Sequence, residues 1–151
     1  MSTLKGQLEA DMTAALKNRD ELVLNTLRMA LTAVRTAEVA GKQARSLSDE
    51  EVRKIVAKQA KQRDEAAEAF EAGGRAEQAE RERAEGRVLA GYLPRQLTEA
   101  ELTAIVDDVF AAESFTEPRQ MGQAMKAVQA KVAGRADGKT VSALVKARLT
   151  G

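Results

Sequence analysis

Few residues of this 151-residue chain have the chemistry of catalysis. The sequence contains no His and no Cys, which removes the commonest general base, the commonest metal ligand and every thiol nucleophile. Asp107 and Asp108 are adjacent, so on a helix they point in different directions and do not form an acid–base or metal-binding pair. Ser142 and Lys146 are one helical turn apart, a spacing too common to indicate a Ser-Lys nucleophile.

The sequence also lacks the short motifs of common enzyme classes. It contains no G-x-x-x-x-G-K-[ST], no G-x-G-x-x-G and no G-x-S-x-G, which are the phosphate-binding loops and the nucleophile elbow. We therefore predict that the chain catalyses no reaction by itself and uses no cofactor and no metal ion. Its function would be to bind a partner.

The strongest binding signal is a concentration of basic residues near the C-terminus. Segment 119–151 has seven basic residues and one acidic residue, whereas segment 98–118 has six acidic residues and no basic one. Such a patch favours RNA, whose phosphates Lys and Arg neutralise. The alternative is that the two segments pair with each other. The candidate RNA-binding residues are Lys126, Lys131, Arg135, Lys139 and Lys146. Only four aromatic residues are present, so base stacking is not expected.

A second candidate site lies in the middle of the first half. Gln59 and Arg63 fall on the apolar stripe that Val52, Val56 and Phe70 form at helical spacing. A guanidinium is unfavourable in an apolar environment unless it is paired. Arg63 either pairs with a carboxylate of a neighbouring helix or extends to water, or else Gln59 and Arg63 line a cleft for an anionic ligand or a partner protein.

These residues are placed by seven predicted helices, because apolar residues recur at helical spacing along the whole chain. Asp20 is expected to cap the second helix, and Ser48 and Thr98 each begin a capping box with a Glu three residues later. The helix over about 75–89 is mostly charged, so we expect it on the surface with only Val88, Leu89 and Tyr92 anchored. No strand is expected, and the fold class is all-α.

A domain boundary is predicted near Pro94, since residues before proline avoid the helical conformation. Residues 1–93 would form an N-terminal helical bundle or hairpin domain, and residues 94–151 a small three-helix domain. No apolar run approaches the roughly 18 residues of a membrane span, and the N-terminus lacks a signal-peptide pattern. Together with the absence of Cys, this predicts a cytoplasmic protein without membrane contact.

Several segments resemble the GatB/YqeY family, and together they extend over essentially the whole chain. The matching segments are 47–52, 58–63, 74–75, 92–97, 121–128 and 134–139. The chain looks like a stand-alone YqeY-like member. The family includes the tail of the B subunit of the glutamine-dependent aminoacyl-tRNA amidotransferase, a helical module that helps to hold tRNA.

The resemblance implies a tRNA- or RNA-binding accessory module with a C-terminal YqeY-like domain. It also implies the family label of a carbon–nitrogen ligase with glutamine as amido donor, but the catalytic parts of that enzyme are absent from this sequence. Two alternatives stay open. One is a protein-interaction adaptor that docks on a partner enzyme without RNA. The other is a subunit of an amidotransferase, active only with its partner proteins.

Overall fold

The computed structural model describes residues 3–150, and all regular secondary structure in this range is helical. The seven α-helices are α1 (Leu4–Lys17), α2 (Glu21–Glu38), α3 (Asp49–Ala72), α4 (Ala76–Ala90), α5 (Glu99–Glu113), α6 (Met121–Val132) and α7 (Gly138–Thr150). A 3-10 turn at Pro118–Gln120 precedes α6. No strand occurs within the described range, so the prediction of an all-α fold is confirmed.

The chain divides into two compact units at the Leu93–Pro94 bond. Helices α1 to α4 belong to the first unit and α5 to α7 to the second. Each unit buries its own apolar cluster. None of the helices within residues 3–150 has both the length and the apolar character needed to cross a bilayer.

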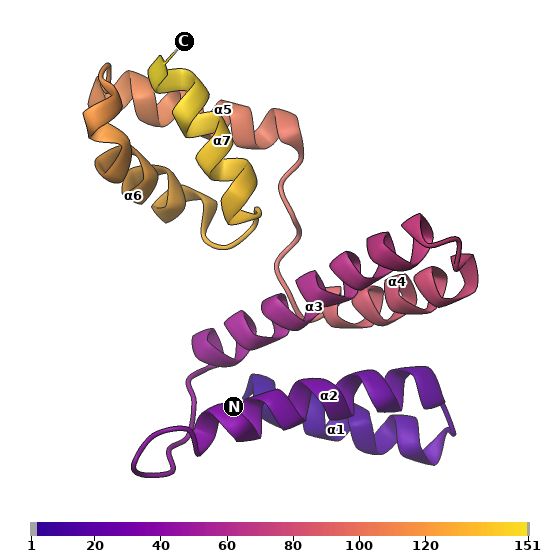
Figure 1. Cartoon of the computed structure of the whole chain (residues 1–151). Coiled ribbons are helices and arrows are strands. Elements are labelled where there is room, and N and C mark those ends of the chain that lie inside the picture. The colour runs from indigo at the N-terminus through magenta and orange to yellow at the C-terminus, as the bar shows by residue number, and fades with distance from the viewer. Residues whose placement is uncertain (1–2, 151) are drawn as a thin grey trace. The chain divides into compact units, whose positions relative to one another are not determined.

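The first unit consists of two helical hairpins, α1 with α2 and α3 with α4 (Figure 1). Their shared core includes Leu8, Leu27, Leu31, Val56 and Leu89, all with at most 2% of their surface exposed. Burial of an aliphatic side chain of this size contributes about 1.5–3 kcal/mol. The hairpins are also joined at one helix end, because the Leu4 N–H donates to the Asp49 carboxylate at 3.0 Å.

The three predicted N-caps are confirmed. The Asp20 carboxylate accepts the Val23 N–H at 3.3 Å. Ser48 and Thr98 each exchange two hydrogen bonds with the Glu three residues later, as a capping box requires. These caps satisfy N–H groups that have no partner within the helix, and they fix where α2, α3 and α5 begin.

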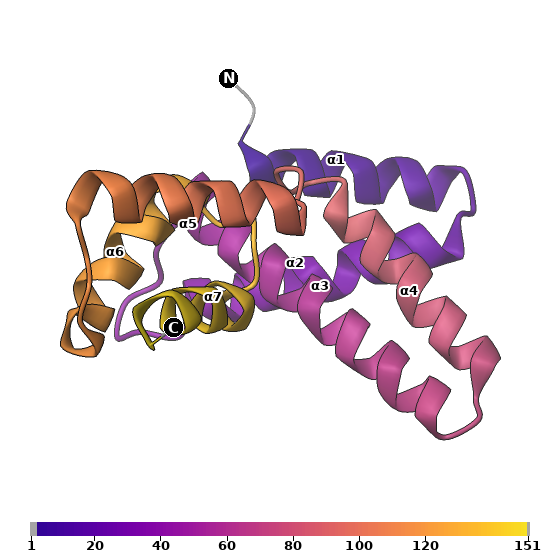
Figure 2. The ribbon, with the colours of Figure 1, turned by 90° about the horizontal axis from the view of Figure 1, so that it is seen from above.

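Helix α4 is less exposed than its charge pattern predicts. It packs along α3 up to the turn at residues 73–75 (Figures 1 and 2), and it buries Ala79, Glu85 and Gly86 in addition to Leu89. The expectation that only the last residues of this helix are anchored is therefore wrong. The physical reason is that small residues of α4, Ala79 and Gly86, are buried where it packs on α3, whose Ala67 is buried too.

The second unit packs three short helices around a core of small β-branched residues. Val106, Val128, Val132, Val141 and Val145 are all nearly or fully buried. The loop between α6 and α7 is joined to the start of this unit, because the Leu97 N–H donates to the Arg135 carbonyl at 2.8 Å. This bond holds the basic loop against the residues that precede α5.

Candidate functional site

Arginine and lysine side chains of the second unit make different contacts. Most of its arginines bind nearby carboxylates: Arg95 pairs with Glu101 at 2.8 Å, and Arg148 pairs with Asp107 at 2.5 Å. Arg119 pairs with Glu117. The Arg148 guanidinium also lies over the Phe110 ring, 5.7 Å from its centroid. Internal pairing of the acidic and basic segments therefore occurs, but arginines make these pairs.

Arg135, a predicted RNA-binding residue, is engaged by its own helix end. Its Nε donates to the Val132 carbonyl at 3.0 Å, and its Nη2 donates to the Lys131 carbonyl at 2.9 Å. These carbonyls lie in the last turn of α6, and the Val132 carbonyl also accepts the backbone N–H of Arg135 at 3.1 Å. The side chain is half-buried, so Arg135 acts here as a C-terminal cap.

The lysines of the second unit are used differently from its arginines. Within residues 3–150, Lys126, Lys131, Lys139 and Lys146 form no ion pair with a carboxylate. All four are exposed. Lys139 and Lys146 are seven residues apart on α7, so they lie on one face of the helix, about 10 Å apart along its axis. This pair is the clearest free basic surface of the unit.

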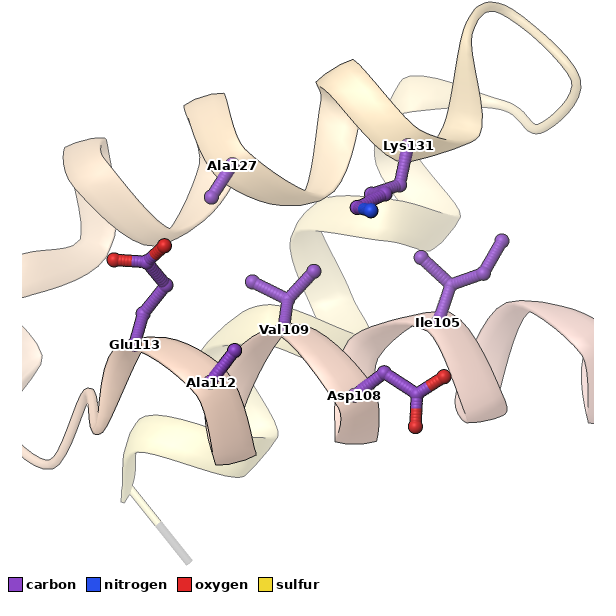
Figure 3. Close-up of a pocket in the computed structure, with 7 residues that line it drawn as sticks. All are labelled: Ile105, Asp108, Val109, Ala112, Glu113, Ala127 and Lys131. Carbon is purple, nitrogen blue, oxygen red and sulfur yellow. The ribbon is translucent and has the colours of Figure 1, made fainter.

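Lys131 is in the last turn of α6. It lines a groove of about 530 Å³ between α5 and α6, together with Asp108, Glu113 and four apolar residues. Figure 3 shows the Lys131 ammonium turned into the groove near Ile105, with the Glu113 carboxylate near Ala127. Lys131 is exposed but faces this groove, and the Arg135 guanidinium binds backbone carbonyls, so neither has the surroundings of Lys126, Lys139 and Lys146.

The structure places Arg63 between helices and pairs it with two carboxylates of α4. Its Nη1 is 3.3 Å from Glu82 and 3.5 Å from Glu85, whose side chain is only 8% exposed. Nη1 also contacts the Met29 sulfur at 3.9 Å. The pairing alternative is therefore the one observed, and the Arg63 charge is compensated internally. Gln59, one turn before, is half-buried on the same helix.

Two glutamates show strong electrostatic perturbation, and both are in capping boxes. The hydrogen bond from Arg45 and that from the Ser48 backbone lower the pKa of Glu51 to about 2. Arg95 and Thr98 likewise lower the pKa of Glu101 to about 2. Both groups are stabilised as anions by local structural bonds, so these perturbations indicate helix capping and give no sign of a catalytic acid.

The aromatic side chains are used inside the fold. Burial, followed by the 2.5 Å hydrogen bond to Asp11, raises the pKa of the Tyr92 phenol. Phe110 packs edge-to-face on Phe115 at 5.7 Å, and Phe70 is half-buried. No aromatic ring in the described range is therefore exposed as a platform for stacked bases.

The sequence did not reveal two features of these sites. Glu82 and Glu85 lie on one face of a densely charged helix, and no sequence pattern near them identifies them as the partners of Arg63. The groove depends on small residues at one helix contact, which the apolar pattern does not distinguish from core. Within residues 3–150, no three acidic side chains are grouped so that they could hold a metal ion.

Comparison with known proteins adds the family of the chain. No curated protein matches the sequence. A family model described as "Yqey-like protein" matches residues 5–149, which includes both units and nearly every residue considered above. The chain therefore belongs to the YqeY-like family.

Proposed function

We propose that this protein is a non-catalytic RNA-binding accessory module whose second unit holds the phosphate backbone of a tRNA. The proposal rests on the different contacts of arginines and lysines in that unit. The arginines bind protein groups, whereas Lys126, Lys139 and Lys146 are exposed and unpaired among the described residues. The resemblance to the tail of the tRNA amidotransferase B subunit favours tRNA over other RNA.

Recognition in this proposal is electrostatic and independent of base sequence. Lys side chains contact phosphates as point charges and displace counterions, so affinity falls steeply as salt is raised. The buried or half-buried aromatic rings argue against base stacking. The RNA is then positioned by its backbone, and any sequence specificity comes from a partner protein or from the shape of the RNA.

The test is a salt titration of tRNA binding, measured by fluorescence anisotropy. The triple variant Lys126→Ala/Lys139→Ala/Lys146→Ala removes three of the four exposed lysines of the second unit and keeps Lys131, which lines the groove between α5 and α6. A matched control, Lys17→Ala/Lys42→Ala/Lys58→Ala, removes three exposed lysines of the first unit that are likewise unpaired in the described structure. We expect the first variant to bind about tenfold more weakly near physiological salt, with the salt slope reduced by about one unit for each lysine.

The control variant is expected to keep the affinity and slope of the wild-type protein. Equal losses in both variants would show a diffuse charge effect and would contradict the assignment to the second unit. No measurable tRNA binding by the wild-type protein would reject RNA binding as the function.

A further inference from the structure

One face of α7, the last helix of the second unit (Figure 1), carries two lysines and otherwise small side chains. Lys139, Ala143, Lys146 and Thr150 recur at the helical spacing of i, i+4, i+7 and i+11, so they share this face. All four residues are exposed. Because alanine and threonine are short, a rigid ligand can contact both ammonium groups at once. We call these four residues the lysine face of α7.

The lysine face is not neutralised by carboxylates of its own helix. Residues 138–150 contain no Asp and no Glu. Neither Lys139 nor Lys146 forms an ion pair within the described residues, and the third cation of the helix, Arg148, pairs with Asp107. Asp137, the carboxylate nearest in sequence to Lys139, precedes the helix. The face is therefore complementary to a ligand that carries several negative charges.

The position of Lys139 does not stabilise α7. This residue is in the first turn of the helix, and that turn contains no acidic residue. The N-terminal end of a helix carries a partial positive charge, so a cation there is unfavourable and an anion is favourable. The fold gains nothing from a lysine at this position, whereas a bound phosphate interacts favourably with both the lysine and the helix end.

We infer that the lysine face of α7 binds an RNA duplex across its major groove, with one lysine on the phosphates of each strand. This inference rests on the proposed function and names the form of RNA that is recognised. Lys139 and Lys146 are seven residues apart on a rigid helix, which is about 10 Å along its axis. In an A-form duplex the phosphates of the two strands face each other across a deep and narrow major groove. Both partners hold their charges at fixed separations, so binding imposes little further order on either.

A single strand and a DNA duplex fit this face less well. Proteins that bind single strands stack bases on aromatic rings, and no aromatic residue within residues 3–150 is exposed. A flexible strand also loses conformational freedom when two of its phosphates are fixed. The major groove of B-form DNA is about 12 Å wide, so the phosphates that face each other across it are farther apart than those of the narrow RNA groove.

Three nucleic-acid probes test which form is recognised. The first is an RNA hairpin with a stem of about 16 base pairs, the span of a double-stranded RNA-binding domain. The second is an unstructured RNA with the same number of nucleotides, and the third is a DNA hairpin of the same sequence. Fluorescence anisotropy measures the affinity of the full-length protein for each at one salt concentration. We expect the RNA hairpin to bind at least about fivefold more tightly than either other probe, a difference of about 1 kcal/mol.

Two variants move the lysines without changing the net charge. Lys139→Ala/Ala143→Lys leaves two lysines three residues apart on the same exposed face, about 4.5 Å along the helix axis. We expect it to lose at least about fivefold in affinity for the RNA hairpin and to bind the unstructured RNA as wild type does. The matched control, Lys139→Ala/Ala143→Lys/Lys146→Ala/Thr150→Lys, moves the pair one turn along the helix and restores the spacing of seven residues. It should recover most of the lost affinity. Circular dichroism melts check that both variants fold.

Failure of this inference is distinguishable from failure of the proposed function. If the wild type binds neither tRNA nor any of the three probes, RNA binding itself is rejected and this inference with it. If the wild type binds tRNA, but binds the unstructured RNA or the DNA hairpin as tightly as the RNA hairpin, RNA binding stands and duplex recognition is overturned. Equal affinity of the wild type and Lys139→Ala/Ala143→Lys for the RNA hairpin would overturn the role of the lysine spacing. Should a variant fail to fold, the comparison of the three probes on the wild type still decides.

Discussion

The two units of this protein use their charges in different ways. In the first unit, ion pairs join one helix to another, as between Lys5 of α1 and Glu38 of α2 or between Arg63 of α3 and the carboxylates of α4. In the second unit the ion pairs are more exposed, with about half of each side chain of the Arg148–Asp107 pair in water, and four lysines have no ion pair within the described residues. Unpaired lysines also occur in the first unit, so the difference between the units lies in how deeply their ion pairs are buried.

We expect the largest loss of stability at the most buried ion pairs of the first unit, those of Arg63. Arg63→Met keeps the aliphatic part of the side chain but leaves Glu82 without its ion partner and leaves the nearly buried Glu85 with only Arg81, 3.7 Å away on α4. Removing one partner of a buried ion pair leaves an uncompensated charge. Because Arg63 and Glu82 keep about a fifth of their side-chain surface in water, we expect a loss of about 2–3 kcal/mol in the free energy of unfolding, measured by urea denaturation.

The control for this variant removes the stranded charges as well. Arg63→Met/Glu82→Gln/Glu85→Gln should recover most of the lost stability, because no unpaired carboxylate then remains between α3 and α4. If Arg63→Met alone costs less than about 0.5 kcal/mol, the range of ordinary surface substitutions, the cluster is not a structural element of the hairpin. Arg63 would then be as uncommitted as the lysines of the second unit.

Features set by neighbouring residues were predictable from the sequence. The caps at Asp20, Ser48 and Thr98 depend on side chains that bond backbone groups only three residues away, so the local pattern contains both partners. The apolar stripes likewise indicated which side of each helix is buried. The all-α fold follows from these two local signals.

Features set by contacts between helices were not predictable in the same way. The partners of Arg63 are about twenty residues away on α4, and their identity depends on the register in which α3 and α4 pack. Arg135 looked like a free cation because the sequence does not show that its guanidinium turns back to the carbonyls of α6. The groove lined by Ala112 and Ala127 is a space that side chains leave unfilled, and the helical spacing of apolar residues does not predict such a space.

The turns that end α3 in the first unit and α6 in the second differ in which residue adopts the left-handed backbone conformation. After α3, the left-handed position falls on Gly74, at φ 75°. After α6, it falls first on Ala133, at φ 51°, and then on Gly134. A left-handed backbone costs a residue with a Cβ about 1–2 kcal/mol, whereas glycine adopts it readily.

Ala133→Gly should therefore raise the free energy of unfolding by about 1 kcal/mol, less whatever glycine loses through its larger entropy in the unfolded chain. Urea denaturation at a single temperature measures the change. Ala130→Gly, within the same helix, is the control and should destabilise by about the same amount. A loss of stability in Ala133→Gly would show that α6 does not end in the left-handed conformation.

We expect acid to weaken the capping boxes at Glu51 and Glu101, one in each unit. The folded-state pKa values of Glu51 and Glu101 are lowered from 4.5 to about 2. A lowered pKa stabilises the folded state above the unfolded value, and that contribution is lost as the pH falls from about 4.5 to about 2. Thermal melts across this window should show a smaller decline for Glu51→Gln or Glu101→Gln than for wild type, and the two variants should behave alike. A decline in either variant that matches the wild type would show that its Arg partner does not hold the carboxylate in solution.

The smallest effect on stability is expected from Lys126→Ala/Lys139→Ala/Lys146→Ala. None of these lysines has an ion pair to lose within residues 3–150, and alanine favours helix more than lysine does. The urea midpoint should stay within the range of surface substitutions, about 0.5 kcal/mol per site, while tRNA affinity falls. A large loss of stability would place these lysines with Arg63, as parts of the fold. If the urea midpoint is unchanged while the affinity for tRNA falls, the lysines bind the ligand and do not stabilise the packing of the helices.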